Sequence, residues 1–111
     1  MFKFIDTMKS YKSETLPEII ALNQGETVKI ILPYTAGTGY TWELIDKLPD
    51  CLEIKNQLAE PASDAAGSGA DYIFIFEAKC SGKSKIRLKY WKSWEGDSSI
   101  EKKITLNFDC K

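Results

Sequence analysis

The sequence predicts an all-β protein, because its patterning is typical of a sandwich built from short strands. Apolar and polar residues alternate with a period of two along most of the chain, as at Val28, Ile30 and Leu32. Turn-forming residues recur about every 8–12 residues, and no segment makes a convincing helix. We therefore expect one domain over residues 1–111, folded as an immunoglobulin-like β-sandwich of about seven to eight strands.

The expected strands are separated by turns such as Gln24-Gly25 and Ser81-Gly82. Trp42, in phase with Leu44, resembles the buried core tryptophan of such sandwiches. One strand, residues 71–77, is apolar on both faces, so we expect it to be covered on both sides. In chain order, the expected strands are residues 16–22, 27–32, 40–45, 51–58, 71–77, 86–90 and 100–108.

Composition favours a self-sufficient core and gives no sign of a nucleic-acid partner. The hydrophobic fraction of 43% is enough to bury one core without metal or disulfide staples. The net charge is −1, whereas nucleic-acid binding relies on many Lys and Arg contacts. The locally basic segment 83–89 alternates with Ile86 and Leu88, which is typical of a half-buried strand with a solvated face.

The chain has no histidine, which excludes the commonest mechanisms of hydrolases. Serine and cysteine nucleophiles activated by histidine are ruled out, as are zinc sites that contain histidine. The 16 acidic residues are nearly balanced by 15 basic ones. They are spread along the chain, as is typical of ion-pair partners on solvent-exposed faces. We therefore expect a non-enzymatic protein that needs no metal or cofactor.

The termini and cysteines suggest a cytoplasmic protein. The start of the sequence has no apolar run of signal-peptide length, and no segment approaches the roughly 20 apolar residues of a membrane span. Cys51, Cys80 and Cys110 are odd in number and widely spaced, so we expect reduced thiols, although one pair could bridge in an exported protein.

Three segments interrupt the alternation, and we call them the first loop (residues 35–40), the second loop (residues 62–70) and the third loop (residues 92–96). Glycines in the first loop, Gly37 and Gly39, allow main chain to approach a partner closely. The second loop is longer than a hairpin needs. We expect the first and third loops to share one end of the sandwich, whereas the pattern does not place the second.

Aromatic residues near these loops have different expected roles. Tyr40 and Trp42 are assigned to the framework, with Tyr40 at the rim. Trp94 lies in a turn-like stretch outside the alternation of the preceding strand, so we expect it to be exposed for binding. Trp91 is expected to cover a sheet edge or to support Trp94.

Taken in chain order, the first, second and third loops resemble those of the chagasin-family inhibitors of papain-like cysteine peptidases. Members carry an Asn-Pro-Thr-Thr-Gly-aromatic loop, whose last three positions match Thr38, Gly39 and Tyr40. The family's Gly-x-Gly-Gly motif is approximated by residues 67–70, and its Arg-Pro-Trp/Phe motif by residues 92–94. The resemblance covers roughly residues 16–108.

The resemblance implies a reversible inhibitor of papain-like cysteine peptidases. We expect it to be a monomer when free and, from its charge and its lack of a membrane span, to bind neither nucleic acid nor membranes. Its first loop would obstruct the catalytic cysteine and histidine, while the second and third loops would grip the cleft walls. Tryptophan is enriched among interface hot spots, and a stiff sandwich lowers the ordering cost of binding. The residues that the resemblance assigns to peptidase binding are Gly37, Thr38, Gly39, Tyr40, Gly67, Ser68, Gly69, Ala70, Lys92, Ser93 and Trp94.

The sequence also departs from the family motifs. In the first loop, Thr35, Ala36 and Gly37 replace Asn, Pro and Thr, while Ala70 and Ser93 interrupt the other two motifs. We expect Gly37 to remove a side-chain contact and Ser93 to make the third loop less rigid than proline would.

Two other classes of function fit parts of the pattern. A non-catalytic adhesion or carbohydrate-binding module would stack Trp91 and Trp94 on sugar rings, and would ignore peptidases. A small enzyme using Asp or Glu would show turnover that is lost when one carboxylate is replaced.

Overall fold

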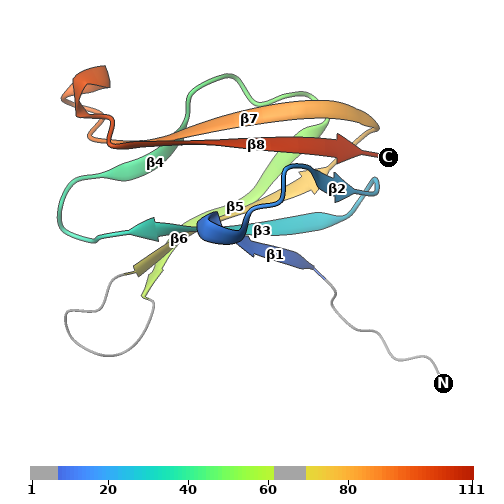
Figure 1. The fold of residues 1–111 in the computed structure, drawn as a ribbon, viewed down its shortest axis with the longest axis horizontal. Helices are drawn as coiled ribbons and strands as arrows, with labels where there is room; N and C mark the ends of the chain where they lie inside the picture. Colours follow the sequence, from blue (N-terminus) through green and yellow to red (C-terminus); the bar gives the residue numbers. More distant parts are fainter. Residues whose placement is uncertain (1–7, 62–69) are drawn as a thin grey trace.

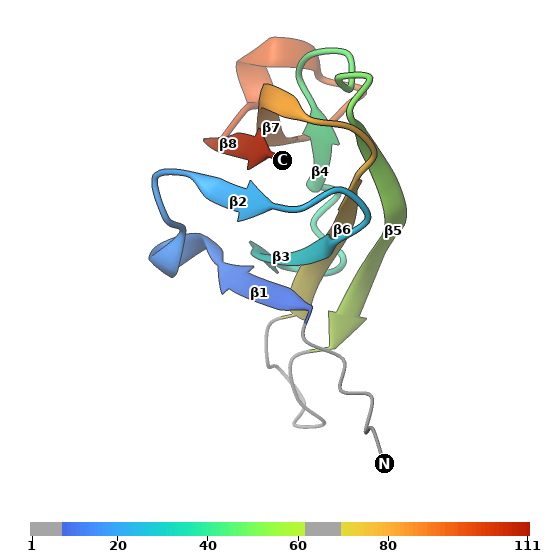
Figure 2. The ribbon, with the colours of Figure 1, turned by 90° about the vertical axis from the view of Figure 1, so that its right-hand side faces the viewer.

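The computed structural model describes residues 8–61 and 70–111 and shows two stacked β-sheets (Figure 1). Within these residues, eight strands form two four-stranded sheets, in the orders β1-β3-β6-β5 and β2-β8-β7-β4. Figure 2 shows the two layers from one end, with β4, β7, β8 and β2 in one and β1, β3, β6 and β5 in the other. The expected all-β sandwich of seven to eight strands is confirmed.

The first sheet is organised around β6, which pairs antiparallel with β3 and β5 on its two sides. Phe74 and Phe76 of β6 face the core. On the opposite face Ile73 is buried but Ile75 is only partly buried, so the expected cover on both sides of this strand is present only in part. β1 adds to β3 in parallel. The strands of this sheet are β1 (Lys9–Lys12), β3 (Thr27–Tyr34), β5 (Leu52–Pro61) and β6 (Ala70–Ala78).

The second sheet contains the long antiparallel pair β7 and β8. The short strand β4 pairs antiparallel with the second half of β7, and β2 pairs in parallel with the end of β8. The strands of this sheet are β2 (Ile20–Leu22), β4 (Thr41–Leu44), β7 (Gly82–Trp91) and β8 (Lys102–Cys110).

The core lies between the sheets, because the period-two pattern turns one face of each strand inward. Val28, Ile30 and Leu32 of β3 are all fully buried, and so is Trp42 of β4, as the sequence predicts. Phe76 of one sheet meets Phe108 of the other edge to face, with ring centroids 5.7 Å apart. Burying each such side chain stabilises the fold by about 1.5–3 kcal/mol.

The N-terminal part differs from the prediction. The strand expected over residues 16–22 is confined to Ile20–Leu22, and the segment before it contains a 3₁₀ turn, η1 (Ser13–Thr15). β1 was not predicted, because four residues of mixed polarity carry little periodic signal. A second 3₁₀ turn, η2 (Gly96–Ser99), begins at the last residue of the third loop. In residues 8–61 and 70–111 no helix is long and apolar enough to span a membrane.

The cysteines differ from the prediction as well. Cys51, just before β5, and Cys80, just after β6, form a disulfide, so the expectation of reduced thiols is wrong for this pair. The pairing arises because Leu52 and Ala78 are partners in adjacent strands, which brings the flanking Cα atoms within 4.8 Å. Cys110, which the structure also describes, is a buried free thiol, as expected.

Candidate functional site

The connections that contain the predicted binding residues start and end at one pole of the sandwich, which we call the loop end. β3 stops at Tyr34 and β4 starts at Thr41, and these residues pair with Ala70 and Trp91 respectively. The first and third loops therefore share an end, as predicted (Figure 1).

The second loop is anchored at the same pole. β5 ends at Pro61 and β6 begins at Ala70, and these two residues are partners in the sheet. Ala70 thus belongs to a strand, which corrects the predicted loop boundary. Gly67, Ser68 and Gly69 lie outside the described residues.

Two hydrogen bonds from the core fix the start of the first loop. The buried Trp42 indole donates from Nε1 to the carbonyl of Pro33 at 2.8 Å. Tyr90, also buried, accepts a hydrogen bond at its hydroxyl from the Thr35 amide at 3.1 Å. The core tryptophan predicted from sequence therefore also holds the loop, and Tyr90 is a loop anchor that the sequence analysis did not identify.

Within the first loop, glycines and a threonine hydroxyl set a tight path. Gly37 and Gly39 have φ angles of 82° and 90°, values that favour glycine. The Thr38 hydroxyl donates to the carbonyl of Thr35 at 2.9 Å and accepts from the Tyr40 amide at 3.3 Å. Because this hydroxyl is engaged inside the loop, the exposed residues 35–39 offer mainly backbone and small side chains.

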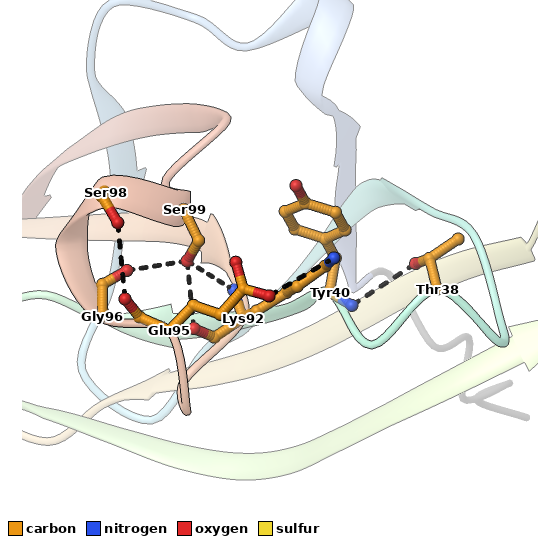
Figure 3. Close-up of polar contacts among 7 residues, drawn as sticks. All are labelled: Thr38, Tyr40, Lys92, Glu95, Gly96, Ser98 and Ser99. Carbon is orange, nitrogen blue, oxygen red and sulfur yellow. Dashed lines mark hydrogen bonds and ion pairs between the residues drawn. The ribbon is translucent and has the colours of Figure 1, made fainter.

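Tyr40 lies at the rim of the core, as predicted. It is half-buried and stacks on Tyr90 with ring centroids 5.2 Å apart. From the third loop, the Lys92 ammonium lies 5.0 Å from the centroid of the Tyr40 ring and 3.8 Å from a Glu95 carboxylate oxygen. Figure 3 shows Lys92 reaching toward both groups, so this lysine connects the two loops.

The third loop is held by Ser99, a buried residue of η2 that the sequence analysis missed. Its hydroxyl accepts from the Lys92 amide at 3.0 Å, and lies 2.7 Å from the Gly96 carbonyl and 3.0 Å from that of Lys92 (Figure 3). The Glu95 amide also donates to the Lys92 carbonyl. These bonds restrain a loop in which Ser93 stands where the family motif has proline.

The two tryptophans of this region have different environments. Trp94 is 69% exposed, so the exposure expected of this residue is confirmed. Trp91 is half-buried, and the Lys89 ammonium lies 3.3 Å from the centroid of its ring. Among the described residues, the Trp91 indole nitrogen has no hydrogen-bond partner. Because Lys89 covers a face of Trp91, the two indoles do not offer a pair of open faces for sugars.

No metal centre accompanies the loops in the described part of the chain, where no group of three or more Cys, Asp or Glu residues is arranged to hold an ion. Lys89 forms an ion pair with Asp97 at 3.8 Å, beside η2. The loop end therefore combines exposed backbone, one large exposed aromatic ring and locally paired charges, which suits contact with another protein.

Comparison with protein families gives a match to the Chagasin family peptidase inhibitor I42 over residues 21–108. The chain belongs to the chagasin family of peptidase inhibitors. As a member of that family it is not an enzyme, in agreement with the absence of histidine.

A curated relative supports this membership. Chagasin from Trypanosoma cruzi is 26% identical over 87 residues, which cover 74% of this chain and 79% of chagasin. The matched region includes most of the sandwich, so the family resemblance seen in three short motifs extends well beyond them.

Three solved structures are similar in fold to this chain. The cysteine protease inhibitor EhICP2 from Entamoeba histolytica has a TM-score of 0.81 at 15% identity, covering 94% of this chain and 96% of that one. Amebosin has a TM-score of 0.73 at 23% identity, covering 94% and 98%. PbICP-C, solved in complex with falcipain-2, has a TM-score of 0.65 at 18% identity, covering 93% and 99%. These likenesses show that the chain has the chagasin-like fold.

Proposed function

We propose that this chagasin-family protein reversibly inhibits papain-like cysteine peptidases by inserting its loop end into the active-site cleft. The observation that carries the proposal is the convergence of the first and third loops at one pole, with Trp94 exposed beside the first loop. The complex of PbICP-C with falcipain-2 supports a cysteine peptidase as the class of partner.

The first loop fits the role of the segment that blocks the catalytic residues. Its exposed part carries no charged side chain, and its glycines leave room for close backbone approach. The second and third loops would contact the two walls of the cleft, through Gly67, Ser68, Gly69 and Ala70 on one side and Lys92, Ser93 and Trp94 on the other.

Inhibition by this route needs no reaction with the peptidase. The sequence has no histidine to activate a nucleophile, and the free thiol of Cys110 is buried at the end of β8, away from the loop end. We therefore propose a reversible complex in which the inhibitor is recovered unmodified.

We propose that the free protein is a monomer and binds neither nucleic acid nor membranes, in line with its net charge of −1. The cytoplasmic location stays a prediction, and the Cys51–Cys80 disulfide favours an oxidising setting instead.

Titration into a papain assay tests the proposed function. We expect the wild-type protein to inhibit stoichiometrically or with a measurable Ki, and intact mass after dissociation to be unchanged. Trp94→Ala should weaken inhibition by about 2 kcal/mol or more, because a large exposed aromatic side chain that becomes buried in an interface is a typical hot spot.

Ile19→Ala is the matched control, since Ile19 is 57% exposed but precedes β2, which pairs with the far end of β8. Its Ki should equal that of the wild type. Full papain activity at micromolar wild-type protein would reject the proposal.

A further inference from the structure

The Trp94 side chain rests on the first loop although most of its surface is open to solvent. A Cβ atom added at Gly39 would lie 3.0 Å from Cζ2 of the Trp94 indole and would overlap the adjacent Cη2. The six-membered ring of the indole therefore occupies the space that any side chain at position 39 would fill.

We propose that Gly39 is a positioning residue that seats the Trp94 indole, so that the first and third loops present one continuous surface. The proposal rests on the proposed function and extends it, because it assigns Gly39 a role toward Trp94 in addition to close approach to the peptidase. Preorganisation of this kind reduces the ordering cost of binding.

Gly37 provides an internal comparison for this role. Both glycines have positive φ, 82° at Gly37 and 90° at Gly39, so alanine strains the backbone similarly at either position. A Cβ at Gly37, however, meets no atom of the described residues within 4 Å. The contact with Trp94 is thus the feature that distinguishes Gly39 from Gly37.

The side chain that Gly39→Ala would displace is an exposed one. Because Trp94 as a whole residue is 69% exposed, its side chain can rotate away into solvent instead of forcing the backbone apart. Gly39→Ala should therefore lower folding stability no more than Gly37→Ala does, yet release the indole from its position. Thermal unfolding of both variants checks that they remain folded to the same extent.

A double-mutant cycle measured as Ki against papain tests the coupling. We expect Gly39→Ala to raise Ki at least about tenfold more than Gly37→Ala, which is a typical effect at an interface anchor. In a Trp94→Ala background, this difference should shrink to about twofold or less, since the coupled partner is absent.

Either of two results would overturn the proposal. Equal increases in Ki for Gly37→Ala and Gly39→Ala would show that the contact between Gly39 and Trp94 has no role in inhibition. A difference that persists in the Trp94→Ala background would show that the added methyl group acts directly on the peptidase.

An NMR measurement on the free protein separates this proposal from the proposed function. The chain has three tryptophans, so each indole N–H gives an assignable signal in a ¹⁵N-labelled sample. The Trp94 signal should shift in Gly39→Ala and stay in place in Gly37→Ala; an unmoved signal in Gly39→Ala would refute the seat. If the wild type fails to inhibit papain, the proposed function fails, and the NMR result alone decides whether Gly39 seats Trp94.

Discussion

Three hydroxyl groups at the loop end hold main chain in place. The Tyr90 hydroxyl accepts a hydrogen bond from the Thr35 amide, and the Thr38 hydroxyl donates one to the Thr35 carbonyl. The Ser99 hydroxyl accepts one from the Lys92 amide in the third loop. With these groups engaged inside the protein, the surface left for a partner is formed mainly by exposed backbone, small residues and Trp94, together with the locally paired charges of Lys92 and Glu95. Shape and apolar contact should therefore dominate recognition at this surface.

Replacing Ser99 by alanine should weaken inhibition while leaving the fold intact. The variant loses the buried hydroxyl and leaves the Lys92 amide without this acceptor, a change that typically costs about 1–3 kcal/mol. We expect a lower unfolding free energy and a higher Ki for papain, because the third loop becomes mobile.

Ser98→Ala is the control for Ser99→Ala. Ser98 is exposed and its hydroxyl makes one long hydrogen bond, 3.4 Å to the Glu95 carbonyl. Its Ki should match the wild type. Equal effects of the two substitutions would contradict the anchoring role of Ser99.

Asp46 gives the fold a pH-dependent contribution away from the loop end. Arg87 donates two hydrogen bonds to its carboxylate, at 2.7 and 2.8 Å, and these hold the pKa of Asp46 below its ordinary value. A depressed folded-state pKa stabilises the protein above the unfolded-state pKa, and the contribution is lost as pH falls through the folded-state value.

Urea unfolding of wild type and Asp46→Asn measures this contribution. The wild type should be slightly more stable at pH 7. The difference should begin to shrink near pH 4, at about the ordinary pKa of an aspartate, and should be lost as pH falls through the lower folded-state pKa of Asp46. A difference in unfolding free energy that stays constant down to about pH 2 would contradict the assignment. The Ki for papain should be the same for Asp46→Asn and the wild type.

At the scale of elements, the long strands connect two poles with different tasks. β6 runs from Ala70 at the loop end to Ala78 near the disulfide, and its neighbours β3 and β5 run in the opposite direction. The disulfide joins the residues just outside β5 and β6 at the pole away from the loops. The disulfide therefore stabilises the fold at a place remote from the proposed binding surface.

Replacing both bridged cysteines by serine should lower stability without changing inhibition. The bridge closes a segment with a sequence separation of 29, for which chain-entropy arguments give about 3–4 kcal/mol. We expect a lower Tm for Cys51→Ser/Cys80→Ser, and an unchanged Ki at temperatures where circular dichroism shows the variant folded. A raised Ki under those conditions would show that the two poles are coupled.

Local pattern predicted the elements better than it predicted the contacts between them. The alternation of β3, β7 and β8 and the apolar β6 indicated strands that the structure confirms, because side-chain phase is a local property. The Cys51–Cys80 pair was missed because it depends on strand register, which no local pattern contains.

The candidate site was predicted in part. The exposure of Trp94 and the rim position of Tyr40 followed from their phase relative to neighbouring strands. Ser99 was missed since a serine near a turn gives only a weak signal, and its three polar contacts become visible when the chain folds back on Lys92.

On the scale of the whole molecule, the protein has few groups that titrate near neutral pH. The sequence contains no histidine, and burial, together with the nearby Asp109, raises the pKa of the Cys110 thiol. The side-chain charges of the protein should therefore change little around neutral pH.

Folding stability should accordingly change little between about pH 6 and pH 8. Urea unfolding at several pH values in this range checks the expectation. Any strong pH dependence of inhibition should then follow the peptidase, and a steep change in the unfolding free energy of the free inhibitor would contradict this prediction.

The most direct test of the account is a crystal structure of the protein bound to papain. We predict that residues 35–40 lie over the catalytic cysteine without a covalent bond and that Trp94 packs against one wall of the cleft. A complex formed through the disulfide pole or an outer sheet face, with the loop end free in solvent, would contradict it.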